Sequence, residues 1–128
     1  MVAELAPASV PARAPWRSTV RLWGANGRAL ISADYVARLG SPEYLTVRTN
    51  GDRALIGLSA YSPRDDALLR RKLSGHSGGA KLVSLIGAVE AIGRAWPPRT
   101  LPLPHSWIAD TLLLDCSGLP LAEGNDGR

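Results

Sequence analysis

The sequence predicts a mainly β protein with two short helices, an α+β chain in which two units of β-β-α-β-β order pack together. Short segments that alternate apolar and polar residues, such as 19–23, indicate strands. Asn-Gly dipeptides at 26–27 and 50–51 are typical of hairpin turns. The chain has 128 residues, of which 45% are hydrophobic, and this suits a single compact domain.

The first half of the chain reads as two hairpins around a short helix. Strands are expected at 19–23 and 29–31, on either side of a turn at 24–27. Ser32 stands where an N-cap belongs, and Gly40 suits the position after a helix that covers 33–39. The Asn50-Gly51 turn then joins strands at 44–48 and 54–58, and 61–66 is a connecting loop.

The second half repeats this order more loosely. A strand at 68–73, a glycine-rich turn at 75–79 and a short apolar strand at 81–83 are followed by a helix from Ser84 to 92. Strands are then expected at 100–103 and 111–115, with a turn around His105 and Ser106 between them.

The two halves align, which suggests a degenerate tandem repeat. Residues 27–32 match 79–84 without a gap, and one inserted residue then places Val36, Leu39 and Gly40 on Val89, Ile92 and Gly93. We therefore expect one domain over 16–117, made of repeats at 16–62 and 66–117, with a flexible arm at 1–15 and a flexible tail at 118–128. A unit this small cannot bury its apolar face alone, so the units are expected to pack together and the chain to form a homodimer.

The net charge of +4 and the isoelectric point of about 9.8 favour an anionic partner. A single cysteine excludes an intrachain disulfide. No signal-peptide pattern and no apolar run of membrane-spanning length is present, so a cytoplasmic protein without a membrane anchor is expected.

Residues 19–58 resemble the AbrB-like, swapped-hairpin transcription factors. The shared pattern is Gly27-Arg28, a short apolar strand, Ser32 at the start of a helix, Leu39-Gly40 and then an extended hairpin. Two positions depart from it, because Ser32-Ala33 stands where the family commonly has proline and Pro42-Glu43 where it favours Gly-Asp. The resemblance implies a swapped-hairpin barrel that binds DNA as a two-fold assembly, with Arg28 in the Gly-Arg turn and Arg21 on the strand before it.

Charge and resemblance together predict that duplex DNA is the partner and that no cofactor is needed. Guanidinium groups suit bidentate contacts with phosphate or guanine, and lysines supply further charge. The candidate DNA-binding residues are Arg17, Arg21, Arg28, Arg70, Arg71, Lys72 and Lys81. The alternative is a protein-interaction module, antitoxin-like or an assembly adaptor, whose basic face meets an acidic protein.

An enzyme is not expected. Residues 75–79 fit the G-x-S-x-G pattern of the hydrolase nucleophile elbow. The segment before them carries Arg70, Arg71 and Lys72, whereas the elbow follows a buried apolar strand. His76, His105 and Cys116 are too widely spaced for a metal motif.

Overall fold

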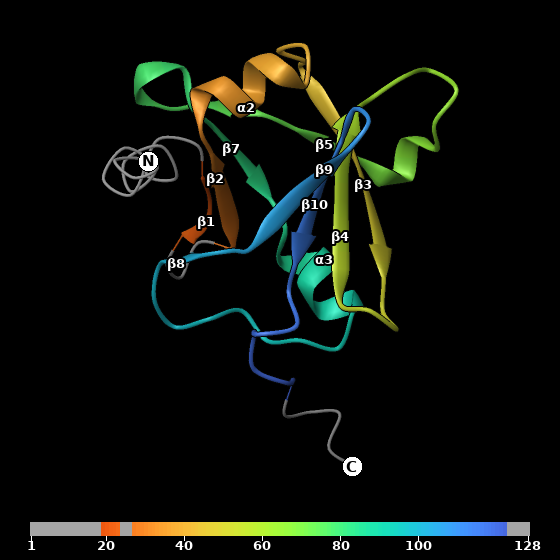
Figure 1. Cartoon of the computed structure of the whole chain (residues 1–128). Coiled ribbons are helices and arrows are strands. Elements are labelled where there is room, and N and C mark those ends of the chain that lie inside the picture. Colours follow the sequence, from red (N-terminus) through yellow and green to blue (C-terminus); the bar gives the residue numbers. More distant parts are fainter. Residues whose placement is uncertain (1–18, 24–26, 123–128) are drawn as a thin grey trace, which may run out of the picture.

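The computed structural model describes residues 19–23 and 27–122, and it has two antiparallel sheets and two short helices (Figure 1). The first sheet has the order β6-β7-β2-β1-β8. Its strands are β1 (Val20–Trp23), β2 (Arg28–Ile31), β6 (Ser74–Gly75), β7 (Lys81–Ser84) and β8 (Leu101–Pro102).

The second sheet has the order β5-β3-β4-β10-β9. Its strands are β3 (Tyr44–Asn50), β4 (Leu55–Ala60), β5 (Arg70–Lys72), β9 (His105–Ile108) and β10 (Thr111–Asp115). The helices are α2 (Ala33–Arg38) and α3 (Ile86–Ala91), and the 3-10 turns are η3 (Ala67–Leu69) and η4 (Ser77–Gly79). The expected mainly β, α+β class is confirmed.

The strands form two sheets and not the single closed barrel that the sequence suggested. The chain turns from one sheet into the other at Leu73, between β5 and β6, and at Leu103-Pro104, between β8 and β9. Both leucines are buried, and their amides donate to Glu43 and Val20 across the corner. Because such bends redirect the strand, each sheet keeps its own hydrogen-bonded ladder.

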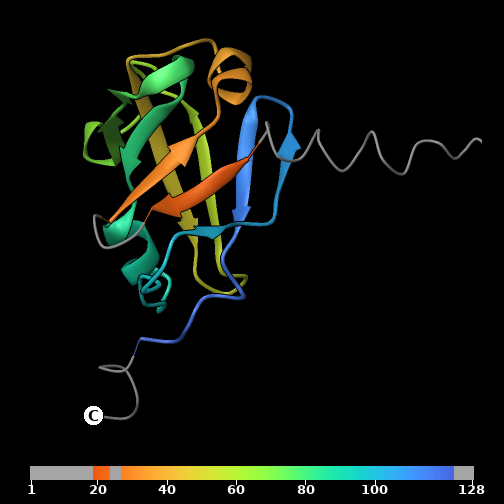
Figure 2. The same cartoon turned by 90° about the vertical axis from the view of Figure 1, so that its left-hand side faces the viewer.

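The core lies between the sheets, and every second residue of the central strands points into it. Figure 2 shows β1 and β2 crossing in front of β3 and β4. The fully buried residues with this spacing are Val20, Leu22, Ala29, Ile31, Ile56, Leu58, Leu112 and Leu114. Because these residues point into the core, the residues between them lie on the outer face of each strand.

The segments that align in the sequence also lie side by side. Strands β2 and β7 pair antiparallel, with Leu30 opposite Leu82, which are matched positions in the alignment. Each strand leads into a short helix that ends at a glycine of positive φ, 92° at Gly40 and 78° at Gly93. This pairing has the local symmetry of two equivalent segments that face each other across a two-fold axis.

Each helix packs against the other half of the chain. Helix α3 contacts β3, whereas Tyr35 of α2 contacts His105 and Trp107 of β9. The first residue of α3, Ile86, lies against Gly27, which has a φ of 71°. The helix of each half is therefore packed against residues of the other half.

Three predicted boundaries are wrong. His105 and Ser106 belong to β9 and not to a turn, because the Tyr35 contacts hold this segment extended, and the turn lies at 109–110. The strand predicted at 68–73 starts only at Arg70, because Asp66 caps the η3 turn by accepting from the Leu68 amide at 2.9 Å. The second helix starts at Ile86, since Ser84 still pairs with Arg28 in the sheet.

Residues 118–122, which the sequence assigned to a flexible tail, are docked on the domain. Leu119 is buried, and backbone hydrogen bonds join Pro120 to Ala95 and Ala122 to Gly93. Arg94 adds side-chain bonds to the carbonyl oxygens of Ser117 and Leu119. The expected arm at 1–15 lies outside the described residues. In the described part of the chain, no helix has the length and apolar character to cross a membrane.

Candidate nucleic-acid interface

Six of the seven predicted DNA-binding residues are described, and Arg17 lies outside the described residues. The six residues lie on four strands that are close to one another in the fold. Arg21 and Arg28 lie on β1 and β2, whereas Arg70, Arg71 and Lys72 form β5, and Lys81 begins β7. Since β5 continues into β6 and β6 pairs with β7, the strands that carry these residues run without a break around one side of the protein.

Arg21 and Arg28 share the outer face of the first sheet. Their neighbours in sequence, Leu22 and Ala29, are buried and point inward, so the two arginines point outward by strand alternation. Arg21 pairs with Leu30, and Arg28 pairs with Trp23, which makes the two arginines diagonal neighbours on this face. Diagonal partners in an antiparallel pair lie about 7–8 Å apart, so one anionic strand could contact both.

Aromatic rings cover part of the same face. The rings of Trp23 and His76 are 4.8 Å apart at their centroids, although β1 and β6 are separated by β2 and β7. Leu82, which has outward-facing Leu30 as its cross-strand partner, is only 5% exposed. The apolar centre of this face is thus covered, and Arg28 lies beside it.

Strand β7 lies between Arg28 and the β5 group. Arg28 pairs with Ser84 of β7, and the β6–β7 ladder ends at Ser74, which pairs with Leu82. Strands β5 and β7 are in contact. Strand β7 thus has β2, which carries Arg28, as its sheet partner and also contacts β5, which carries Lys72.

The three basic residues of β5 have different surroundings. The Cζ atom of Arg70 lies 4.7 Å from the ring centroid of Tyr44 and 5.3 Å from that of Tyr61. Arg71 instead donates from Nη1 to the carbonyl oxygens of Leu68 and Arg70, at 3.0 and 2.8 Å. Lys72 is exposed. The Arg71 guanidinium is therefore bonded to nearby backbone carbonyl oxygens, whereas Arg70 and Lys72 are the better candidates for contact with a ligand.

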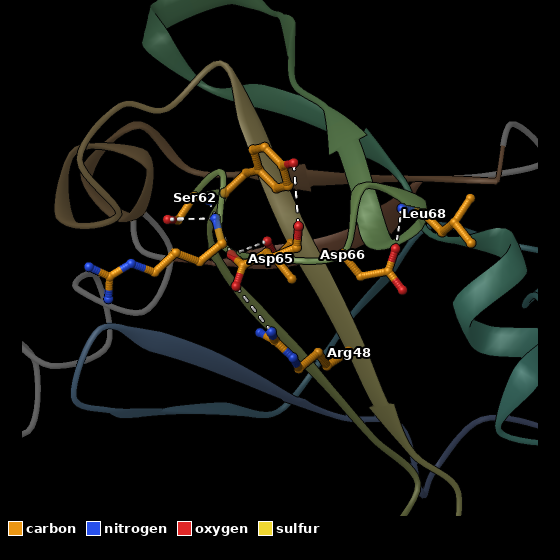
Figure 3. Close-up of polar contacts among 8 residues, drawn as sticks. Arg48, Ser62, Asp65, Asp66 and Leu68 are labelled. Atoms are coloured by element: carbon orange, nitrogen blue, oxygen red, sulfur yellow. Dashed lines mark hydrogen bonds and ion pairs between the residues drawn. The ribbon is translucent and has the colours of Figure 1, made fainter.

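Asp65 fixes the loop that brings Tyr61 beside Arg70. Its Oδ2 accepts from the Thr46 hydroxyl at 2.8 Å and from the Ser62 amide at 3.1 Å, and its Oδ1 meets Arg48 Nη2 at 3.3 Å (Figure 3). The Thr46 hydrogen bond is the main reason that the pKa of Asp65 is lowered, followed by the Ser62 amide. The carboxylate is thus ionised and already paired with a cation.

The first sheet carries no acidic residue. Its five strands contain Arg21, Arg28 and Lys81 and neither aspartate nor glutamate, and β5 adds three further basic residues. Carboxylates of the described chain lie mainly in helices, turns and loops, as at Asp34, Asp52 and Asp110. The charged residues on the strands that hold the predicted residues are therefore all basic, but Lys81, the partner of inward-facing Ile31, lies on the opposite face from Arg21 and Arg28.

Sequence reasoning missed Tyr44, Tyr61 and Asp65. The two tyrosines meet because the β3–β4 register, in which Leu45 pairs with Ala60, places Tyr44 opposite Tyr61. Their backbones are bonded, with the Tyr61 amide donating to the Tyr44 carbonyl oxygen at 3.0 Å. Counting outward from the correct hairpin loop would have found this pair.

The G-x-S-x-G segment does not have the surroundings of a nucleophile elbow. It overlaps β6, a two-residue exposed edge strand, and continues into the η4 turn, in which Gly78 and Gly79 have positive φ. Within the described ranges, no three His, Cys, Asp or Glu residues gather as a metal site would require.

No protein-family model, no curated protein and no solved structure matches this chain.

Proposed function

We propose that this protein is a duplex DNA-binding regulator that acts as a homodimer of the swapped-hairpin kind. The observation that carries the proposal is the charge of the first sheet, whose strands hold no acidic residue and whose outer face carries Arg21 and Arg28, with three more basic residues on β5. Such a surface can neutralise phosphates and release their counterions, which supplies most of the free energy of DNA binding that does not depend on sequence.

The β1–β2 hairpin is the proposed centre of the interface. Arg28 is half-buried beside the turn of this hairpin, opposite Trp23, and its guanidinium has no hydrogen bond or ion pair with another described residue. Its five donors are thus available for a phosphate or for a guanine edge. Arg21 lies diagonally behind it and adds charge on the same face.

Salt-dependent binding to duplex DNA tests the proposal. Affinity for a labelled duplex is measured by fluorescence anisotropy between 50 and 200 mM salt, and a steep loss of affinity is expected. Arg28→Ala should weaken binding and lower the magnitude of the salt slope by about one unit if it contacts one phosphate. Arg53→Ala is the matched control, because Arg53 is an exposed arginine in the β3–β4 turn of the other sheet.

Two results would overturn the proposal. One is the absence of duplex binding by the wild-type protein at low salt, which would favour an acidic protein as the partner of the basic strands. The other is equal affinity and equal salt slope for Arg28→Ala, Arg53→Ala and the wild type, which would remove the β1–β2 hairpin from the interface.

A further inference from the structure

Among the basic residues of β5, Arg70 is held between two aromatic rings. The rings of Tyr44 and Tyr61 have centroids 6.5 Å apart and planes inclined by 64°, so they form an open V. The Arg70 guanidinium lies over both rings. A cation held over two aromatic faces loses little further side-chain entropy when it binds a ligand.

The donors of this guanidinium are not used within the fold. Arg70 is exposed, and its side chain makes no hydrogen bond or ion pair with any other residue in the described part of the chain. The nearby carboxylate of Asp65 is already occupied by Thr46, Ser62 and Arg48. An arginine that is fixed in place but has unused donors is suited to two parallel hydrogen bonds with the oxygens of one oxyanion.

Lys72 adds a second cation beside this guanidinium. Arg70 pairs with Thr46, and Lys72 pairs with Tyr44, so the two side chains share one face of β5 and stand two residues, or about 6.8 Å, apart. Arg71, between them, is bonded to backbone carbonyl oxygens. The site therefore offers one oriented guanidinium and one exposed ammonium.

We propose that Arg70, held between Tyr44 and Tyr61 and assisted by Lys72, is a preformed site for one phosphate group of the bound DNA backbone. This inference rests on the proposed DNA binding. The guanidinium covers the ring faces that form the V, so the tyrosines position Arg70 and do not stack on bases. Asp65 is a positioning residue, because its hydrogen bonds hold the loop that carries Tyr61.

Arg70→Lys tests the site while keeping its charge. Lysine still neutralises one phosphate but cannot bind bidentately or stack as a plane, so duplex affinity should fall about three- to tenfold with an unchanged salt slope. Arg64→Lys is the matched control, because Arg64 is an exposed arginine on the neighbouring loop, and it should bind as the wild type does.

Tyr61 provides a second, independent test. Tyr61→Phe keeps the ring and should bind normally, whereas Tyr61→Leu removes it and should weaken binding about two- to fivefold. Circular dichroism and thermal melts establish that each variant is folded. Wild-type affinity for both Arg70→Lys and Tyr61→Leu would overturn this inference and leave the proposed function intact.

Two further outcomes separate the sources of phosphate. No duplex binding by the wild-type protein would overturn the proposed function and this inference with it. Inorganic phosphate serves as the second probe, with the Arg70 Nε–H signal followed by NMR. Saturable binding of inorganic phosphate by a protein that does not bind duplex would assign the site to a free phosphate and overturn its assignment to DNA.

Discussion

The hydroxyl of Tyr35 on α2 lies 2.7 Å from Nε2 of His105 on β9, and this contact joins the helix of the first half to a strand of the second. Nδ1 of His105 is 2.9 Å from the carbonyl oxygen of Leu103, which can only accept, so Nδ1 carries the proton. In the neutral imidazole Nε2 is then the acceptor, and Tyr35 donates to it. Trp107 packs on the same tyrosine ring, and Arg38 lies 4.1 Å above the Trp107 ring centroid.

Tyr35→Phe is expected to destabilise the fold. The change removes the donor and leaves the half-buried Nε2 of His105 without its partner, at a cost of about 0.5–1.5 kcal/mol. Urea unfolding followed by fluorescence measures the loss. Tyr44→Phe is the control, because the Tyr44 hydroxyl has no hydrogen bond with another described residue, and equal losses for the two variants would contradict the role given to the Tyr35 hydroxyl.

Gly27→Ala should destabilise the protein more than Gly40→Ala. Both glycines have positive φ, 71° and 92°, so alanine is strained at either position by about 1 kcal/mol. A Cβ atom at Gly27 would also lie 2.9 Å from Cβ of Ile86, whereas nothing lies within 4 Å of one at Gly40. Overpacking of this kind costs about 1–3 kcal/mol more. Thermal melts of both variants check the difference. Equal melting temperatures would show that Ile86 moves away from the added Cβ atom without loss of stability.

Asp65→Asn should destabilise the protein in a pH-dependent way. The pKa of Asp65 is lowered in the folded protein, first by the Thr46 hydrogen bond, so ionised Asp65 stabilises the fold. This contribution is fully present above the ordinary carboxyl pKa of about 4 and is lost as the pH falls through the lower, folded value. The difference in unfolding free energy between wild type and variant should thus be constant near neutral pH and shrink below about pH 4. A difference that does not change across this range would contradict the ionised pairing.

Cys116 should be unreactive while the protein is folded. The residue is fully buried, and burial raises the pKa of its thiol to about 11, with the Asp115 charge adding to the effect. At pH 8 the reactive thiolate is therefore scarce as well as inaccessible. Labelling by a thiol reagent should be slow for native protein and rapid in denaturant. Fast native labelling would show that the segment around Cys116, directly after β10, opens locally.

Local features of the sequence determined the types of the elements. Alternation of apolar and polar residues at 19–23 predicted β1, and the matched segments at 27–32 and 79–84 anticipated the order of strand, helix and glycine seen at both places. These features depend on neighbouring side chains and on the φ that glycine permits, so they can be read from short windows. The sequence placed Arg21 on a strand and Arg28 in the turn after it, whereas Arg28 is the first residue of β2.

Tertiary structure alone decided which residues meet across the fold. The Asn50-Gly51 pair predicted a hairpin, and the loop of this hairpin covers residues 51–54. The length of the loop sets the register that places Tyr44 opposite Tyr61. Burial of Leu119 docks a segment that looked like a polar tail, and the Tyr35 contact keeps His105 in a strand where a turn was expected. Each outcome depends on the free energy of packing between distant segments, which the local sequence does not encode.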